Sequence, residues 1–325
     1  MWGFIKAYVK SMRLYYAFIT GIAGWLGIAF YEYLAVGNET IMEVPSYSKK
    51  FVILTLLFLS WGINQIINDF LGLKEDRINA PERPMVTGEL NAKKAVMVSG
   101  LLLLLSLAVI SIYLEPVAII PAIAGVLLNI LYEYAKGYGV FGNVVFGIMI
   151  AMSTAVGFLA SGPLDAPYIT KDFCIIFGLV AVLNGTMTFY TYFKDYVGDK
   201  SAGKKTLVVK YGLNTSRKIA ILLAFIPALS IMGIFLSGNT EIEMNATFAF
   251  LALITFFLQL WTGYLYYRYP QGDKTYYSLA VNFRACACGQ AALIAFFDAG
   301  LALKLFILTY VFIGFLFDLH ANSRT

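Results

Sequence analysis

Charged residues are scarce in this chain of 325 residues: 13% are Asp, Glu, Lys or Arg, whereas 60% are hydrophobic. Soluble globular domains carry about 25% charged residues, so the composition excludes an ordinary soluble domain. Histidine occurs once and cysteine three times. A Cys286-x-Cys288 pair with no His or further Cys nearby is a poor zinc site. The two cysteines are better explained as small side chains that pack between helices.

Long hydrophobic runs fill most of the sequence, and each approaches the roughly 20 residues with which a helix crosses a bilayer. We place these spans at residues 14–36, 51–67, 95–113, 117–132, 140–160, 173–192, 219–236 and 246–267. Residues 277–319 hold one or two more, because charged residues interrupt that stretch. The period-two alternation of a membrane barrel is not visible. The predicted fold is therefore all-α, a single polytopic membrane domain over residues 1–325 with nine or ten transmembrane helices.

Basic residues concentrate in alternate loops. Most of the 24 Lys and Arg residues lie in the N-terminal segment and in the loops after the second, fourth, sixth and eighth spans. The positive-inside rule places these loops in the cytoplasm. The net charge of +5 is therefore a signal of membrane topology. Because spans separate the basic residues, we expect membrane lipid as a partner and no nucleic acid.

Two polar segments end hydrophobic helices on the predicted cytoplasmic side. In residues 64–77, four residues recur at steps of four and so share one face of a helix, namely Asn64, Asn68, Gly72 and Asp76. In residues 194–207, Asp195 and Asp199 continue a similar stripe. Asn and Thr in such stripes also hold helices together by hydrogen bonds, but that role explains the carboxylates poorly.

Each stripe leads into a basic loop, and this combination suggests a ligand. Polar side chains are costly inside a bilayer, so their placement on one helix face is informative. Carboxylates that repel each other at a membrane surface need a cation to share. We expect the two stripes to face each other across a cavity open to the cytoplasm, and to bind a divalent metal and a polyphosphate.

The two segments resemble the two signatures of the UbiA superfamily of intramembrane prenyltransferases. Residues 68–88 resemble its N-D-x-x-D-x-x-x-D pattern and the following R-I-N-x-P-x-R-P-x-x-S-G tail. Residues 195–207 resemble its D-x-x-x-D-x-x-x-G-x-x-T-L pattern, and Lys136 followed by Gly142-Asn143 resembles the segment between its fourth and fifth spans. Order, spacing and cytoplasmic placement agree, and the resemblance covers nearly the whole chain.

The resemblance implies a fold of nine helices around a central cavity, with a lateral opening through which a prenyl chain enters from lipid. It also implies Mg²⁺ as the cofactor and a prenyl diphosphate as the substrate. The implied catalytic residues are Asp69, Asp76, Asp195 and Asp199. The same four residues and Asn68 are the implied metal ligands. Mg²⁺ prefers six oxygen ligands and keeps several waters, so one or two carboxylates per ion suffice.

Basic and aromatic residues near the two segments are candidates for substrate binding. Arg suits phosphate because its planar fork donates two hydrogen bonds at once, and aromatic faces steady a carbocation. Together with Asn64 and Asn68, the candidates are Arg77, Arg83, Lys136, Tyr132, Tyr192, Lys194 and Lys205. The alternative for any one Lys is that it only sets topology, and for any one aromatic residue that it only packs.

One position departs from the family pattern: Gly72 stands where the first signature carries its middle Asp. This change removes a carboxylate from one metal site. Glu75 precedes the last Asp by one residue and lies on another helix face, so it is an imperfect substitute. Because the second signature and Arg83-Pro84 are intact, we expect an active enzyme.

The acceptor stays open at this point. The tail after Asp76 is similar to that of archaeal geranylgeranylglyceryl-phosphate geranylgeranyltransferases and chlorophyll synthases, whereas the spacing of Asp195 and Asp199 resembles the quinone-pathway enzymes. The acceptor is therefore an aromatic quinone precursor or a lipid-precursor hydroxyl. Two alternatives remain: a terpene cyclase of the same superfamily, and a non-catalytic membrane protein that binds lipid or acts as a transporter. Transporters usually place their polar residues near the bilayer midplane instead.

Overall fold

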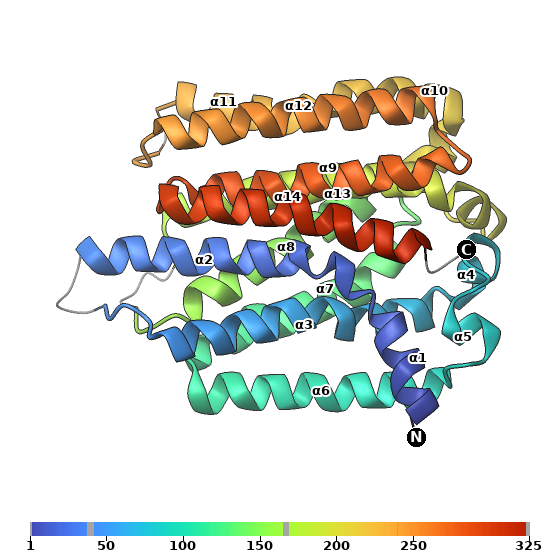
Figure 1. Cartoon of the computed structure of the whole chain (residues 1–325), viewed down its shortest axis with the longest axis horizontal. Helices are drawn as coiled ribbons and strands as arrows, with labels where there is room; N and C mark the ends of the chain where they lie inside the picture. Colours follow the sequence, from blue (N-terminus) through green and yellow to red (C-terminus); the bar gives the residue numbers. More distant parts are fainter. Residues whose placement is uncertain (1, 38–41, 165–168, 239, 323–325) are drawn as a thin grey trace.

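Long helices lie side by side along one direction and make up the protein (Figure 1). The computed structural model describes residues 2–37, 42–164, 169–238 and 240–322. In this part of the chain, an isolated bridge between Tyr138 and Lys205 is the only β-type pairing. The prediction of an all-α membrane fold is confirmed.

The helices follow one another with short connections. Their bounds are α1 (Trp2–Met12), η1 (Leu14–Tyr16), α2 (Phe18–Gly37), α3 (Tyr47–Leu71), α4 (Leu73–Asn79), α5 (Pro84–Thr87), α6 (Ala92–Tyr113), η2 (Pro116–Ala118), α7 (Ile119–Ala135), α8 (Val140–Leu159), α9 (Lys171–Ser201), α10 (Leu207–Leu223), α11 (Ile226–Leu236), α12 (Ala246–Arg268), α13 (Lys274–Ile294) and α14 (Ala299–Asn322). The short helices α4 and α5 lie at the same end of the bundle as α1 (Figure 1).

Within the described residues, nine helical segments are long and apolar enough to cross a membrane, and α10 and α11 together form one of them. The protein is therefore an integral, multi-pass membrane protein. Helix α13 is a further long helix that the apolar criterion leaves out. It carries Asn282 and Gln290, and both side chains are buried between helices. Because these polar side chains do not face the lipid, α13 can be less apolar than the other long helices. The chain thus reaches α14 through a polar but enclosed helix.

Helix α9 is longer than the predicted span 173–192. Its start is fixed by Thr170, whose side chain accepts a hydrogen bond from the backbone N–H of Phe173, the usual N-cap arrangement. Its 31 residues give a length of roughly 46 Å at 1.5 Å per residue. The hydrocarbon core is about 30 Å thick, so the last turns extend beyond it. Those turns carry Asp195 and Asp199.

Glycines let the central helices approach closely. A Cβ at Gly27 of α2 would lie 2.1 Å from the backbone oxygen of Thr154 in α8, and one at Gly157 of α8 would lie 2.1 Å from the backbone oxygen of Gly24. Small residues are the usual means of close helix packing in membranes. In Figure 1, α8 and α9 lie inside the bundle, whereas α6 and α12 lie at opposite edges.

Candidate active site

A cavity of about 510 Å³ opens within the bundle, lined mainly by α3, α4, α6, α7, α8 and α9. At one end its lining is polar and charged, and includes Asp69, Asp76 and Lys136. Away from that end the lining is largely apolar, with Leu107 and Val126 among its residues. The cavity can therefore bind an elongated ligand that is charged at one end and apolar along the rest of its length.

The polar stripe of the first segment crosses a break between two helices. Helix α3 ends at Leu71 and α4 begins at Leu73. The helical hydrogen bonds nevertheless continue through Gly72, whose N–H donates to the Asn68 oxygen at 2.8 Å and whose oxygen accepts from the Asp76 N–H at 3.0 Å. Asn68, Gly72 and Asp76 consequently still line the cavity, as their spacing predicted.

Asp69 and Asp76 share two arginines. Asp69 forms ion pairs with Arg13 and with Arg83, the latter at 3.4 Å, and Arg83 also pairs with Asp76. Gln65 Nε2 donates to Asp69 Oδ1 at 3.0 Å. Burial raises the pKa of Asp76 to about 6, with the Asp69 charge acting in the same direction and Arg83 opposing both. We call these four charged residues the arginine cluster.

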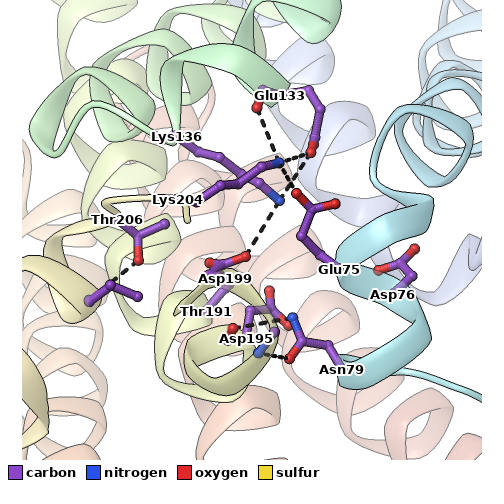
Figure 2. Close-up of polar contacts among 12 residues, drawn as sticks. Glu75, Asp76, Asn79, Glu133, Lys136, Thr191, Asp195, Asp199, Lys204 and Thr206 are labelled. Atoms are coloured by element: carbon purple, nitrogen blue, oxygen red, sulfur yellow. Dashed lines mark hydrogen bonds and ion pairs between the residues drawn. The ribbon is translucent and has the colours of Figure 1, made fainter. Parts of the chain in front are cut away.

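A second group of charges lies where α4, α7 and α9 meet (Figure 2). Lys204 Nζ contacts Glu75 at 2.9 Å and also pairs with Glu133. Lys136 Nζ lies 3.3 Å from Glu133 and 3.9 Å from Asp199. Burial would lower the pKa of Lys136, but Glu133 and Asp199 raise it well above its usual value, so its ammonium stays charged. We call these five residues the lysine cluster.

Asn79 joins the two signature segments. Its Nδ2 donates to the Asp195 backbone oxygen at 3.1 Å, and its Oδ1 accepts from the Gly198 N–H at 2.8 Å. The side chain therefore fixes the end of α4 against the last turns of α9 (Figure 2). This contact places Glu75 and Asp195 at the same end of the cavity.

Several buried oxygens at this end have no hydrogen-bond partner among the residues that the structure describes. They include Asn68 Oδ1, Glu75 Oε2 and both carboxylate oxygens of Asp199. Carboxylate and amide oxygens are the ligands that Mg²⁺ prefers, so the residues present fit this ion. No group of three or more His, Cys, Asp or Glu in the described ranges forms a ready-made metal site. The carboxylates are instead paired with arginines and lysines.

The predicted site residues fall into three groups. Nine line the cavity: Asn64, Asn68, Asp69, Asp76, Arg83, Tyr132, Lys136, Lys194 and Asp195. Asp199 and Tyr192 are buried, and Asp199 reaches the site through Lys136. Arg77 and Lys205 are exposed and lie outside the cavity lining.

Four residues of the two clusters were absent from the predicted set, namely Arg13, Glu133, Lys204 and Glu75. The sequence suggested Glu75 only as an imperfect substitute for the missing Asp. Arg13 precedes the first span by one residue, and nothing in its local sequence marks it. Lys204 neighbours the predicted Lys205, and the loop decides between them. The Lys205 N–H donates to the Gly137 oxygen at 3.3 Å, which pins that loop while Lys204 turns inward. Glu133 lies three residues before Lys136. Helical spacing would have placed the two residues on the same face, and this signal could have identified Glu133.

Comparison with known proteins agrees with this geometry. A model of the UbiA prenyltransferase family matches residues 42–287. Digeranylgeranylglyceryl phosphate synthase of Sulfolobus acidocaldarius is 29% identical over 240 residues, which cover 72% of this chain and 80% of the relative. The protein of the same name from Methanosarcina mazei is 29% identical over 227 residues, covering 67% and 75%.

Solved structures share the fold. A UbiA homologue from Archaeoglobus fulgidus bound to DMAPP and Mg²⁺ superposes with a TM-score of 0.65 at 18% identity, covering 93% of this chain and 99% of that one. A structure of digeranylgeranylglyceryl phosphate synthase gives a TM-score of 0.61 at 21% identity, covering 91% and 98%.

Proposed function

Because this chain belongs to the UbiA prenyltransferase family, we propose that it transfers a long prenyl group from a prenyl diphosphate to the hydroxyl of a glycerol phosphate lipid precursor, with Mg²⁺ as cofactor. Prenyl transfer is the activity of the family, and the acceptor is the finer part of the proposal. It is supported by relatives named digeranylgeranylglyceryl phosphate synthase. The observation that carries the proposal is a cavity inside the bundle with a charged end and an apolar length.

The charged end suits the diphosphate. Arg13, Arg83, Lys136 and Lys194 line it, and Arg binds phosphate oxygens bidentately. Mg²⁺ held by the signature oxygens would neutralise the charge that develops on the leaving diphosphate. The arginines already share Asp69 and Asp76, so these carboxylates hold the guanidinium groups facing the cavity before substrate arrives.

The apolar length suits the prenyl chain. The α7 residues that line the cavity run from Pro121 to Glu133, roughly 18 Å at 1.5 Å per residue. Leu127 of α7 lines the cavity and is 60% exposed. We infer that the chain enters from lipid beside α7.

The reacting carbon would lie where the two parts meet. The bond between the allylic carbon and the bridging oxygen breaks, and both electrons leave with the diphosphate. The acceptor oxygen then bonds to that carbon and gives up its proton. Tyr132 and Phe146 line this part of the cavity with ring centroids 5.1 Å apart, and Trp61 packs on Phe146. Aromatic faces of this kind stabilise a nearby cation.

A product screen tests the proposal. Purified protein in lipid nanodiscs is incubated with geranylgeranyl diphosphate, Mg²⁺ and either a prenylglyceryl phosphate, an aromatic quinone precursor or no acceptor, and products are identified by mass spectrometry. The proposal predicts a second ether-linked prenyl chain on the glyceryl phosphate. Prenylation of the aromatic acceptor alone would overturn the choice of acceptor. A hydrocarbon or terpene alcohol formed without acceptor would indicate a cyclase.

A further inference from the structure

The missing carboxylate at position 72 has a neighbour that occupies its place. A Cβ built on Gly72 would lie 3.4 Å from Oε1 and 3.8 Å from Cδ of Glu133. A side chain at position 72 would thus point directly at the Glu133 carboxylate. Glu133 comes from α7, a different helix from the one that carries the first signature. Gly72 and Glu133 both line the cavity.

Glu133 is held as an inward-facing carboxylate. The residue is 7% exposed and lies near the C-terminal end of α7. Its Oε1 pairs with Lys204 and, at 3.3 Å, with Lys136. Buried carboxylates are rarely tolerated without partners, and these two lysines pair with the Glu133 carboxylate beside Gly72.

The lysine cluster contains more carboxylates than ammonium groups. Glu75, Glu133 and Asp199 form their ion pairs in the described part of the chain with two ammonium groups, those of Lys136 and Lys204. Over the described ranges, both oxygens of Asp199 and Oε2 of Glu75 lack hydrogen-bond partners. Buried charge that is not fully compensated is costly, so the cluster is suited to a further cation.

We propose that Glu133 supplies the carboxylate that the first signature lacks at position 72, as an oxygen ligand for Mg²⁺ bound with the diphosphate. The inference rests on the proposed function, and it explains why loss of the middle Asp leaves a complete site. The carboxylates of the metal site then come from α3, α4, α7 and α9. Glu75 is a poorer substitute, because the three atoms nearest to a Cβ at position 72 belong to Asn68 and Glu133 and not to Glu75.

The test measures metal binding directly. Mn²⁺ replaces Mg²⁺ and its free concentration is followed by electron paramagnetic resonance, with protein saturated by a geranylgeranyl thiolodiphosphate that does not ionise. Four proteins are compared: wild type, Glu133→Gln, Gly72→Asp/Glu133→Gln and the control Glu89→Gln. Glu89 is an exposed carboxylate near the same end, with Lys10 4.0 Å away.

Loss of a side chain that supports a metal site typically weakens metal affinity by about 10–100-fold. We therefore expect Glu133→Gln to bind Mn²⁺ at least about tenfold more weakly than wild type. The double variant, which returns a carboxylate at position 72, should recover most of that affinity, and Glu89→Gln should match wild type. A purely structural ion pair between Glu133 and Lys204 would not be rescued from position 72.

Two results would overturn the inference. If Glu133→Gln binds Mn²⁺ as tightly as wild type, Glu133 is not a ligand, although the proposed function stands. If wild type itself binds no Mn²⁺ with the analogue, the proposed metal-dependent function fails as well. If Glu133→Gln fails to fold in detergent, the double variant alone decides. Weak Mn²⁺ binding by the folded double variant would contradict the inference that a carboxylate at position 72 and one at position 133 can replace each other as metal ligands.

Discussion

At the scale of single residues, adjacent side chains in one loop have opposite placements. Lys204 is turned inward to Glu75 and Glu133, whereas Lys205 is exposed. The cause is a backbone contact, since Lys205 pairs with the loop after α7. Sequence spacing could not separate the two lysines, because that contact joins Tyr138 and Lys205, which are 67 positions apart in the chain.

We predict that Lys204→Gln raises KM for the prenyl diphosphate by about tenfold or more. The substitution removes the charged hydrogen bond from Lys204 to Glu133 at the charged end of the site, and such a bond contributes about 1.5–3 kcal/mol. Lys205→Gln is the matched control and should change KM less than about twofold, since exposed charges contribute little. Steady-state kinetics with varied prenyl diphosphate measures both. Equal effects of the two substitutions would contradict the inward placement of Lys204.

The first signature shows how far spacing reaches. Steps of four correctly predicted that Asn68, Gly72 and Asp76 share a face that lines the cavity. The same argument could not show what Gly72 faces, because Glu133 approaches from another helix. The pairing of Arg13 with Asp69 was invisible for the same reason. Local periodicity predicts faces, whereas contacts between helices depend on packing.

At the scale of elements, α4 is the connector between the two signatures. It is only seven residues long, too short to be stable by itself. Asn79 attaches its end to α9 through two hydrogen bonds. Asn79 therefore adds a second attachment to the hydrogen bonds through Gly72, and it helps to position Glu75 and Asp76.

We predict that Asn79→Ala lowers the free energy of unfolding by about 1–3 kcal/mol, because the Gly198 N–H loses its partner. It should also raise KM for the prenyl diphosphate, since α4 loses its attachment. Lys74→Ala, an exposed change on the same helix, serves as the control. Melting in detergent and steady-state kinetics check the two effects, and an unchanged KM would contradict the connector role of α4.

The contact between α2 and α8 depends on glycine. A Cβ at Gly27 would meet backbone atoms of Thr154 at 2.1 Å, whereas one at Gly100 of α6 meets nothing within 4 Å. We predict that Gly27→Ala destabilises the protein by about 1–3 kcal/mol through overpacking. Gly100→Ala should be neutral or slightly stabilising, as Ala favours helix by up to about 1 kcal/mol. Thermal unfolding in detergent compares them, and equal melting temperatures would contradict the close approach of α2 and α8.

At the scale of the whole molecule, hydropathy predicted the class of fold but not its inner organisation. Spans facing lipid, such as Ala92–Tyr113, are strongly apolar and were found close to their predicted bounds. Helix α13 is enclosed by other helices, so its sequence carries polar residues. Whether residues 277–319 held one helix or two was therefore undecided until the separate helices α13 and α14 were seen.

Topology gives a prediction for the intact protein in cells. By the positive-inside rule, the basic loops predict that the site end of the protein faces the cytoplasm. A membrane-impermeant thiol reagent should label Lys205→Cys only after the cells are opened, and Tyr47→Cys in intact cells. Both variants also carry Cys174→Ser, because Cys174 is exposed and would react with the reagent, whereas Cys286 and Cys288 are buried. Labelling of Lys205→Cys in intact cells would reverse the orientation.

The most direct test of the central claim is the release of diphosphate from geranylgeranyl diphosphate by protein in lipid nanodiscs. The account predicts release that requires Mg²⁺, increases when a prenylglyceryl phosphate acceptor is added, and falls at least about a hundredfold in Asp195→Asn, in the range found when groups that stabilise transition-state charge are removed. Release that is absent under every condition, or equal with Mg²⁺ and with EDTA, would contradict it.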